Sequence, residues 1–172
     1  MKSNYVRRAE KFMREFYPYL KKAYSLEQAV MAFNREKSRK VSCASGMIRR
    51  CLIVSDYVVK WDYNSEAAHT YGGCKNEYKV YKAIQNSGYE YLFMPITPIE
   101  VHNRTYYVMP RIDSLAYDTI YEDDEDASIE NYLSDEELAF IYDNLCLQDL
   151  HDENWGFLKG KVKIIDYAMC GI

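Results

Sequence analysis

Three side chains near the C-terminal end of the sequence have types and a spacing that suit phosphoryl-transfer chemistry. Asp149 and Asn154 stand five residues apart in "QDLHDEN", and Asp166 follows twelve residues later in "IIDYA". Oxygen ligands suit Mg²⁺, which usually takes one or two protein side chains and completes its shell with phosphates and water. Phosphoryl transfer also needs a cation on the phosphates and a carboxylate that orients the attacking hydroxyl. Asn154 and Asp166 are therefore candidate metal ligands and Asp149 a candidate catalytic carboxylate; an acidic surface turn is the alternative.

The element that must position the two ligands is a short hairpin. The segments "WGFL" and "KVKIID" predict strands, and Lys159-Gly160 between them predicts a tight turn. Asn154 and Asp166 would then lie at the two ends of this hairpin. Before it, "SDEELAFIYDNLCL" predicts a helix that begins with a capping box of Ser134 and Glu137. Its expected core stripe is Leu138, Ile141 and Leu145.

The upstream part of the chain predicts the order β-β-β-α-β-β over residues 38–110. Three strands are expected within "KVSCASGMIRRCLIVSDYVVKWDY", a helix from about residue 74 to 86, and two strands in "YLFMPI" and "RTYYVMP". Two helices precede them. The first has an apolar stripe over residues 4–17 and is expected to stop at Pro18, and the second begins at Ser25 and ends near residue 36.

Charge and composition exclude some classes of partner. The chain has 172 residues, of which 48% are hydrophobic, and a formal charge of −4, which argues against bulk nucleic-acid binding. The charge is unevenly placed. Residues 35–50 are rich in Lys and Arg with Glu36 as the only acid, and could meet an anion, whereas residues 121–130 hold six acids and predict a solvated loop.

The cysteines and the apolar runs indicate the compartment. The five cysteines are scattered without a CxxC pair, which favours a reducing environment over a disulfide framework or a zinc site. The start "MKSNYVRRAEKF" has no apolar core segment of a signal peptide, and no run reaches the roughly 18 apolar residues of a membrane span. We expect a soluble cytoplasmic protein that does not contact membrane.

"QDLHDEN" resembles the catalytic loop of the protein-kinase-like superfamily, in which a catalytic Asp precedes a metal-binding Asn by five residues. The variant with His two residues after the Asp, here Asp149 and His151, is similar to aminoglycoside and choline phosphotransferases. "IIDYA" resembles the family's metal-binding Asp motif. The resemblance implies that Asp149 is catalytic and that Asn154 and Asp166 hold Mg²⁺.

The upstream half resembles the N-terminal lobe of the same family. Lys60 in "YVVKWDY" matches the third-strand Lys that contacts the nucleotide phosphates and serves catalysis, and Glu77 in "KNEYKVY" matches the helix Glu that holds it. "YYVMPRID" resembles the fifth strand and hinge, which implies adenine contacts around Met109 and Arg111. Gly46 in "SCASGMI" stands where the family has its glycine-rich loop.

The sequence also departs from the family. "SCASGMI" offers a single glycine, Gln148 replaces the residue that usually precedes the catalytic Asp, and Tyr167-Ala168 replaces Phe-Gly. The sequence ends four residues after Ala168, before the helices that hold a peptide substrate in protein kinases, so we expect either a truncated chain or a naturally minimal kinase fold. Miniature kinase-like proteins of this kind look like some encoded by bacteriophages.

We therefore expect an α+β, protein-kinase-like fold with three parts: a helical pair over 1–37, an N-lobe over 38–112 and a reduced C-lobe over 113–172. The expected function is an ATP- and Mg²⁺-dependent phosphotransferase acting on a protein hydroxyl. The alternative is a non-catalytic, pseudokinase-type module that binds a nucleotide or a partner protein. A third possibility is an unrelated α+β protein whose acidic loop binds a basic partner.

Overall fold

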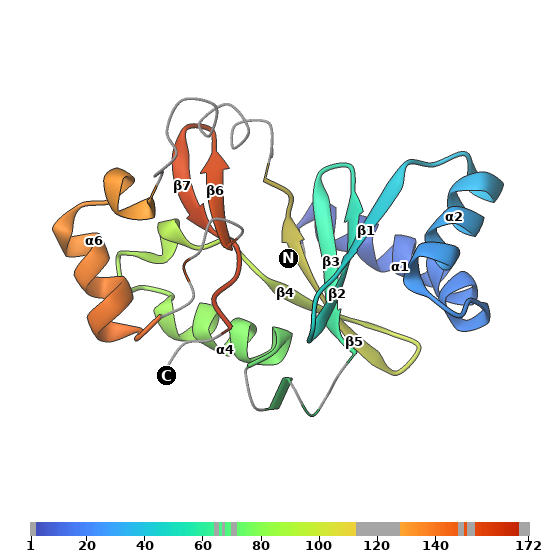
Figure 1. Cartoon of the computed structure of the whole chain (residues 1–172), viewed down its shortest axis with the longest axis horizontal. Helices are drawn as coiled ribbons and strands as arrows, with labels where there is room; N and C mark the ends of the chain where they lie inside the picture. The colour runs from blue at the N-terminus through green and yellow to red at the C-terminus, as the bar shows by residue number, and fades with distance from the viewer. Residues whose placement is uncertain are drawn as a thin grey trace. The chain divides into compact units, whose positions relative to one another are not determined.

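The computed structural model describes residues 3–63, 66, 68–69, 72–112, 128–147, 150 and 154–168. It is an α+β protein whose chain divides into two compact units (Figure 1). Unit 1 comprises Met1–Cys74 and Ile96–Arg111, and unit 2 comprises Lys75–Pro95 and Ile112–Ile172. The sequence-based division at residues 37 and 112 stays a prediction. Across the described ranges, none of the helices combines the length and the apolar character that crossing a membrane requires.

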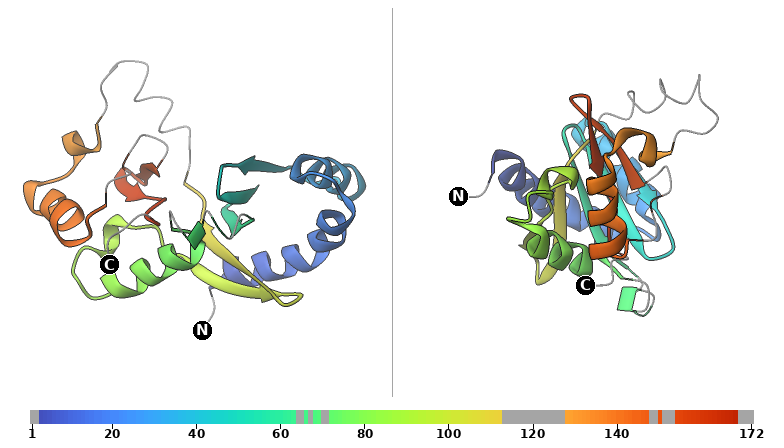
Figure 2. Two further views of the ribbon diagram at one scale, coloured as in Figure 1. Left: turned by 60° about the horizontal axis from the view of Figure 1, so that its bottom comes forward. Right: turned by 90° about the vertical axis from the view of Figure 1, so that its left-hand side faces the viewer.

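Unit 1 is built on a five-stranded antiparallel sheet in the order β1-β2-β3-β5-β4. The strands are β1 (Val41–Ser45), β2 (Arg49–Val54), β3 (Tyr57–Asp62), β4 (Thr97–Val101) and β5 (Arg104–Pro110). The expected Ser55-Asp56 turn joins β2 to β3, and "RTYYVMP" is β5 as predicted. β4 and β5 form a hairpin, drawn in yellow in Figure 2, whose turn residues His102 and Asn103 have φ of 51° and 58°.

Two helices, α1 (Asn4–Lys22) and α2 (Leu26–Lys37), contribute to the core on one face of this sheet. Their apolar stripes bury Phe12, Phe16 and Phe33 against the sheet residues Val59 and Tyr106. The Ser25 hydroxyl caps α2 by accepting a hydrogen bond from the backbone N–H of Gln28 at 3.3 Å, as the sequence indicates. Successive residues of a strand face opposite sides of a sheet, so Lys60 lies on the face opposite to Val59.

Two predictions about these elements were wrong. Pro18 does not end the first helix, because α1 continues to Lys22. Pro18 removes the helical partner of the Arg14 carbonyl, and both residues are exposed, so water can take that partner's place. "YLFMPI" is not a strand: it holds a 3₁₀ turn, Glu90–Leu92, and β4 begins only at Thr97.

Unit 2 contains most of α4 (Cys74–Ile84), then α6 (Asp135–Ala139) and a hairpin of β6 (Trp155–Leu158) and β7 (Lys161–Ile164). Ser134 and Glu137 form the predicted capping box at the start of α6. The predicted helix over residues 134–147 is only partly right, because α6 passes into a π-helical turn at Phe140–Asn144. Of its expected core stripe, Ile141 and Leu145 are buried, whereas Leu138 is half-buried.

Candidate functional site

Asn154 and Asp166 meet at the open end of the β6–β7 hairpin. The backbone carbonyl of Asn154 accepts hydrogen bonds from the N–H groups of Ile165 at 2.8 Å and Asp166 at 3.3 Å. Asn154 is 6% exposed and Asp166 is half-buried. An amide oxygen and a carboxylate are thereby held on adjacent backbone segments, and both are oxygen donors of the kind that Mg²⁺ takes.

The register of the hairpin makes these two residues neighbours. Trp155 pairs with Ile164, and the turn residues Lys159 and Gly160 have φ of 53° and 73°. Two consecutive residues with positive φ are typical of the tight turns that match the twist of a hairpin. Because the turn has two residues, the register is fixed along the whole pair, and Asn154 comes opposite the chain that leaves β7.

The residue after Asp166 anchors this segment in the core of unit 2. Tyr167 is 0% exposed, and its hydroxyl donates to the backbone carbonyl of Met94 at 2.6 Å. Its ring meets that of Phe93 edge-on, with centroids 5.2 Å apart. The N–H of Met94 in turn donates to the carbonyl of Ile164 at 2.9 Å. Asp166 therefore lies between two fixed points, the end of β7 and the Tyr167 side chain.

Glu77 lies on α4, the helix that contacts the chain just after Asp166. The Asn76 side-chain amide donates to the backbone carbonyl of Ala168 at 2.5 Å, which ties α4 to the chain just after Asp166. Glu77 itself is 0% exposed. A buried carboxylate is costly unless it is hydrogen-bonded or paired, and Glu77 is not without an interaction partner. Unit 2 thus brings Glu77, Asn154 and Asp166 onto connected segments.

Lys60 lies in the middle of the sheet of unit 1. It pairs with Cys51 of β2 and Tyr107 of β5, and it is 4% exposed. A lysine in a strand more commonly lies on an edge strand and extends into solvent. β3 is instead a central strand, and Lys60 is buried. Lysines are almost never fully buried unless paired, and Lys60 does have an interaction partner.

Gly46 lies in the turn between β1 and β2. Its N–H donates to the carbonyl of Arg49 at 2.9 Å, and its own carbonyl accepts from the hydroxyl of Tyr63 at 2.9 Å. The N–H of Tyr63 also donates to the carbonyl of Ile48 at 3.1 Å. Tyr63, just after β3, therefore braces this turn. Sequence reasoning missed it because its partners are up to 17 residues away.

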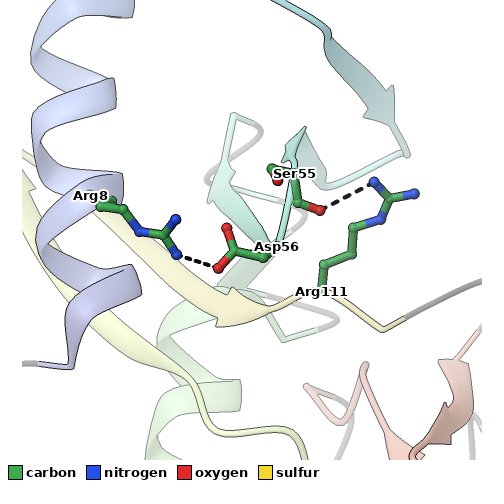
Figure 3. A network of polar contacts seen from close by, with 4 residues as sticks. All are labelled: Arg8, Ser55, Asp56 and Arg111. Atoms are coloured by element: carbon green, nitrogen blue, oxygen red, sulfur yellow. Dashed lines mark hydrogen bonds and ion pairs between the residues drawn. The ribbon is translucent and has the colours of Figure 1, made fainter.

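Met109 and Arg111 have different surroundings. Met109 is 4% exposed and pairs with Val58, so it shares the Lys60 face of the sheet. The Arg111 guanidinium instead donates to the carbonyl of Ser55 at 3.4 Å, and its N–H donates to the carbonyl of Asp56 at 2.9 Å. Figure 3 shows this side chain reaching the β2–β3 turn.

Asp62 is a second residue that sequence reasoning missed. Its carboxylate accepts from the N–H of Cys74 at 3.0 and 3.1 Å and so caps the first turn of α4. A Cβ on Gly73 would lie 2.5 Å from this carboxylate, which explains why a glycine stands there. An N-cap residue usually immediately precedes its helix. The sequence does not indicate Asp62 as a cap, because it lies twelve residues before Cys74.

The remaining catalytic candidate, Asp149, lies outside the described residues, as does His151. Within the described ranges, His, Cys, Asp and Glu side chains form no group of three or more that could hold a metal. Asn154 is not one of those residue types, so a metal held by Asn154 and Asp166 would not involve such a group. No protein-family model matches the chain, and no curated protein matches it.

Proposed function

We propose that the chain is an ATP- and Mg²⁺-dependent phosphotransferase of protein-kinase-like fold that acts on a protein hydroxyl. The observation that carries the proposal is the pair of hydrogen bonds from Ile165 and Asp166 to the carbonyl of Asn154. They join the backbones of two residues with oxygen-bearing side chains, in the part of the sequence that resembles the family's metal-binding motifs. Mg²⁺ characteristically uses one or two protein ligands beside phosphates, so this pair is sufficient on the protein side.

The other site residues have roles that their surroundings favour. Lys60 would contact the nucleotide phosphates, with Glu77 as its partner; both are buried charged residues, 4% and 0% exposed. Buried charged residues are often found at functional sites, although structural pairs also occur. Gly46 would lie over the phosphates and Met109 against the base. The proposal requires the two units to bring Lys60 and the Asn154–Asp166 pair to one nucleotide.

The reaction has one bond formed and one broken. The acceptor hydroxyl oxygen forms a bond to the γ-phosphorus, the bond from this phosphorus to the β–γ bridging oxygen breaks, and ADP leaves. Asp149 would orient the hydroxyl and accept its proton. The metal supplies charge neutralisation on the phosphate oxygens, and Asn154 and Asp166 would hold it.

Transfer of labelled γ-phosphate from ATP tests the proposal. The protein is incubated with Mg²⁺ and a panel of acceptor proteins, with its own chain as one acceptor. We expect labelled protein with wild type and loss of at least about 100-fold in rate with Asp149→Asn, the usual scale for removal of a catalytic base. Asp143→Asn, at an exposed carboxylate of unit 2, is the matched control and should keep wild-type rates.

Two results would count against catalysis. Equal label incorporation by wild type and Asp149→Asn would show that the activity belongs to a contaminant. No transfer to any acceptor, with a thermal stabilisation by ATP and Mg²⁺ that Asp166→Ala abolishes, would favour a non-catalytic nucleotide-binding module instead. Saturation at about 100 times Kd would add roughly 2.7 kcal/mol to the free energy of unfolding, which a thermal-shift measurement detects.

A further inference from the structure

Unit 1 has a pocket on the face of its sheet opposite to Lys60. The pocket has a volume of about 510 Å³ and lies between α1, the start of β1 and the β2–β3 turn. Tyr57, which lines it, is on the same strand face as Val59, the face that α1 and α2 pack against. Lys60, Gly46 and Met109 are not among the residues that line the pocket, whereas Arg111 bonds to two that are, Ser55 and Asp56.

Four cationic side chains line this pocket. Arg8 and Lys11 come from α1, and Arg39 and Lys40 come from the segment between α2 and β1. The acids in the lining are Glu15 and Asp56. The balance is four positive charges against two negative ones. The basic run noted in the sequence thus contributes to a concave cationic surface together with α1, which lies far from it in the chain.

Two of the cations are already engaged, in pairs that an anion can displace. Arg8 forms an ion pair with Asp56, and both side chains are 50% exposed (Figure 3). Arg39 and Glu15 lie 3.3 Å apart, with side chains 47% and 33% exposed. Ion pairs this exposed typically contribute about 0–1 kcal/mol. A dianion that contacts both arginines can therefore replace them at little cost.

The two lysines of the pocket are exposed and available. Among the ion pairs formed within the described part of the chain, none joins Lys11 or Lys40 to an acid. Long lysine side chains with three rotatable donors suit a phosphate as point charges. Lys11 and Lys40 account for the excess of two positive charges in the pocket. This excess matches in size the negative charge of a phosphate monoester near neutral pH.

Part of the pocket lining is apolar or aromatic. This part consists of Phe12, Val41, Val54 and Tyr57. Burial raises the pKa of Tyr57 to about 12, and Arg8 and Asp56 act on it with opposite signs. The Tyr57 hydroxyl therefore stays protonated and neutral near neutral pH. A ligand that fills this space needs an apolar body as well as an anionic group.

We propose that this pocket binds a small phosphate monoester that carries an aromatic or similarly apolar group. The volume lies within the usual range for small-molecule pockets, about 300–1,000 Å³. The four cationic side chains of the lining would take the phosphate, and its apolar part of Phe12, Val41, Val54 and Tyr57 would take the apolar body. The site does not depend on the nucleotide site for its charge or its shape.

A titration followed by ¹H–¹⁵N NMR tests the proposal, with phenyl phosphate as the probe. We expect saturable shifts at the amides of residues 39–41 and 54–57, and an affinity that falls as the salt concentration rises. Phenol and inorganic phosphate each carry one half of the probe and should bind more weakly. Equal binding of phenol would overturn the anionic half of the proposal, and equal binding of inorganic phosphate would overturn the apolar half.

Lysine variants then identify the groups that bind the phosphate. Lys11→Ala and Lys40→Ala should each weaken phenyl phosphate binding by at least about tenfold, which corresponds to loss of about 1.4 kcal/mol, because each removes a charge-assisted hydrogen bond to the phosphate. Lys11→Arg should retain most of the affinity. Lys21→Ala, at an exposed lysine near the end of the same helix, is the matched control and should bind like wild type.

Three results would overturn the assignment. These are no saturable binding of phenyl phosphate to the wild-type protein, shifts that map to residues outside the pocket, and affinities unchanged in both alanine variants. The wild-type titration is decisive by itself, so the proposal does not depend on how well any variant folds.

Discussion

Replacement of Tyr167 by Phe removes one buried hydrogen bond and leaves the ring in place. The Tyr167 hydroxyl donates to the carbonyl of Met94 at 2.6 Å, and both residues are 0% exposed. Removal of one partner from a buried hydrogen bond costs about 1–3 kcal/mol, because the other partner keeps its desolvation penalty. The edge-on contact with Phe93, 5.2 Å between centroids, is unchanged in this variant. We therefore expect Tyr167→Phe to be about 1–3 kcal/mol less stable than wild type.

A larger truncation should cost more. Tyr167→Ala also removes the ring and leaves a cavity, and loss of a buried aromatic side chain typically costs about 3–5 kcal/mol. Tyr142→Phe is the matched control: its hydroxyl also donates a hydrogen bond, to Glu130 at 3.1 Å, but Tyr142 is 38% exposed. Exposed substitutions usually change stability by no more than about 0.5 kcal/mol.

The assay must report on unit 2 alone. The chain has two tryptophans, Trp61 in unit 1 and Trp155 in unit 2. In a Trp61→Phe background, the fluorescence of Trp155 follows denaturant unfolding of the hairpin unit. A midpoint change for Tyr167→Phe no larger than that of Tyr142→Phe would refute the reasoning. It would mean that the bond to Met94 does not anchor the chain after Asp166.

Two further predictions concern a turn and a carboxylate. Gly160→Ala should destabilise the hairpin by about 1–2 kcal/mol, because the φ of Gly160 is 73°, in the left-handed region. Gly46→Ala should not be destabilising, because a Cβ at this position would meet no atom within 4 Å. Chemical denaturation compares the two variants. Burial raises the pKa of Glu137, but hydrogen bonds from Tyr91 and Ser134 outweigh it, so the net shift is downward. Because the pKa of Glu137 is lower in the folded state, its ionised carboxylate stabilises the fold at pH values above the carboxyl pKa of the unfolded chain. This contribution is lost as the pH falls through the pKa of Glu137 in the folded state. The stability advantage of wild type over Glu137→Gln should therefore shrink on acidification, and an advantage independent of pH would contradict this assignment.

The hairpin that carries the candidate ligands could be predicted because its signals are local. Lys159 and Gly160 specify a two-residue turn, and the strands on either side then pair in one register. Once this register is set, Asn154 and Asp166 must come together at the open end. The capping box of Ser134 and Glu137 was predictable for the same reason, since all of its contacts fall within four consecutive residues.

The wrong prediction for "YLFMPI" came from contacts between distant segments. "YLFMPI" has the composition of a strand, but Phe93 bridges to Ile164 and Met94 bonds to both Ile164 and Tyr167. These long-range contacts override a weak local preference. Tyr63 escaped detection in the same way, because the turn that it braces lies up to 17 residues earlier in the chain.

The basic run at residues 35–50 shows a different limit. Its charge suggested an anion partner, but charge alone cannot distinguish a solvated face from a pocket. The pocket depends on Arg8 and Lys11, which α1 brings beside Arg39 and Lys40. No pattern within the run predicts this pairing, because it follows from how α1 and α2 pack on the sheet.

The central claim is that Asn154 and Asp166 hold the metal of a bound nucleotide, and paramagnetic NMR tests it most directly. Mn²⁺ replaces Mg²⁺ in a complex with ATP, and broadening of amide signals locates the ion. The account predicts broadening centred on residues 154–155 and 165–167 that is lost in Asp166→Ala and kept in Asp143→Ala. Broadening that is absent, or centred elsewhere, or unchanged in Asp166→Ala would contradict the claim.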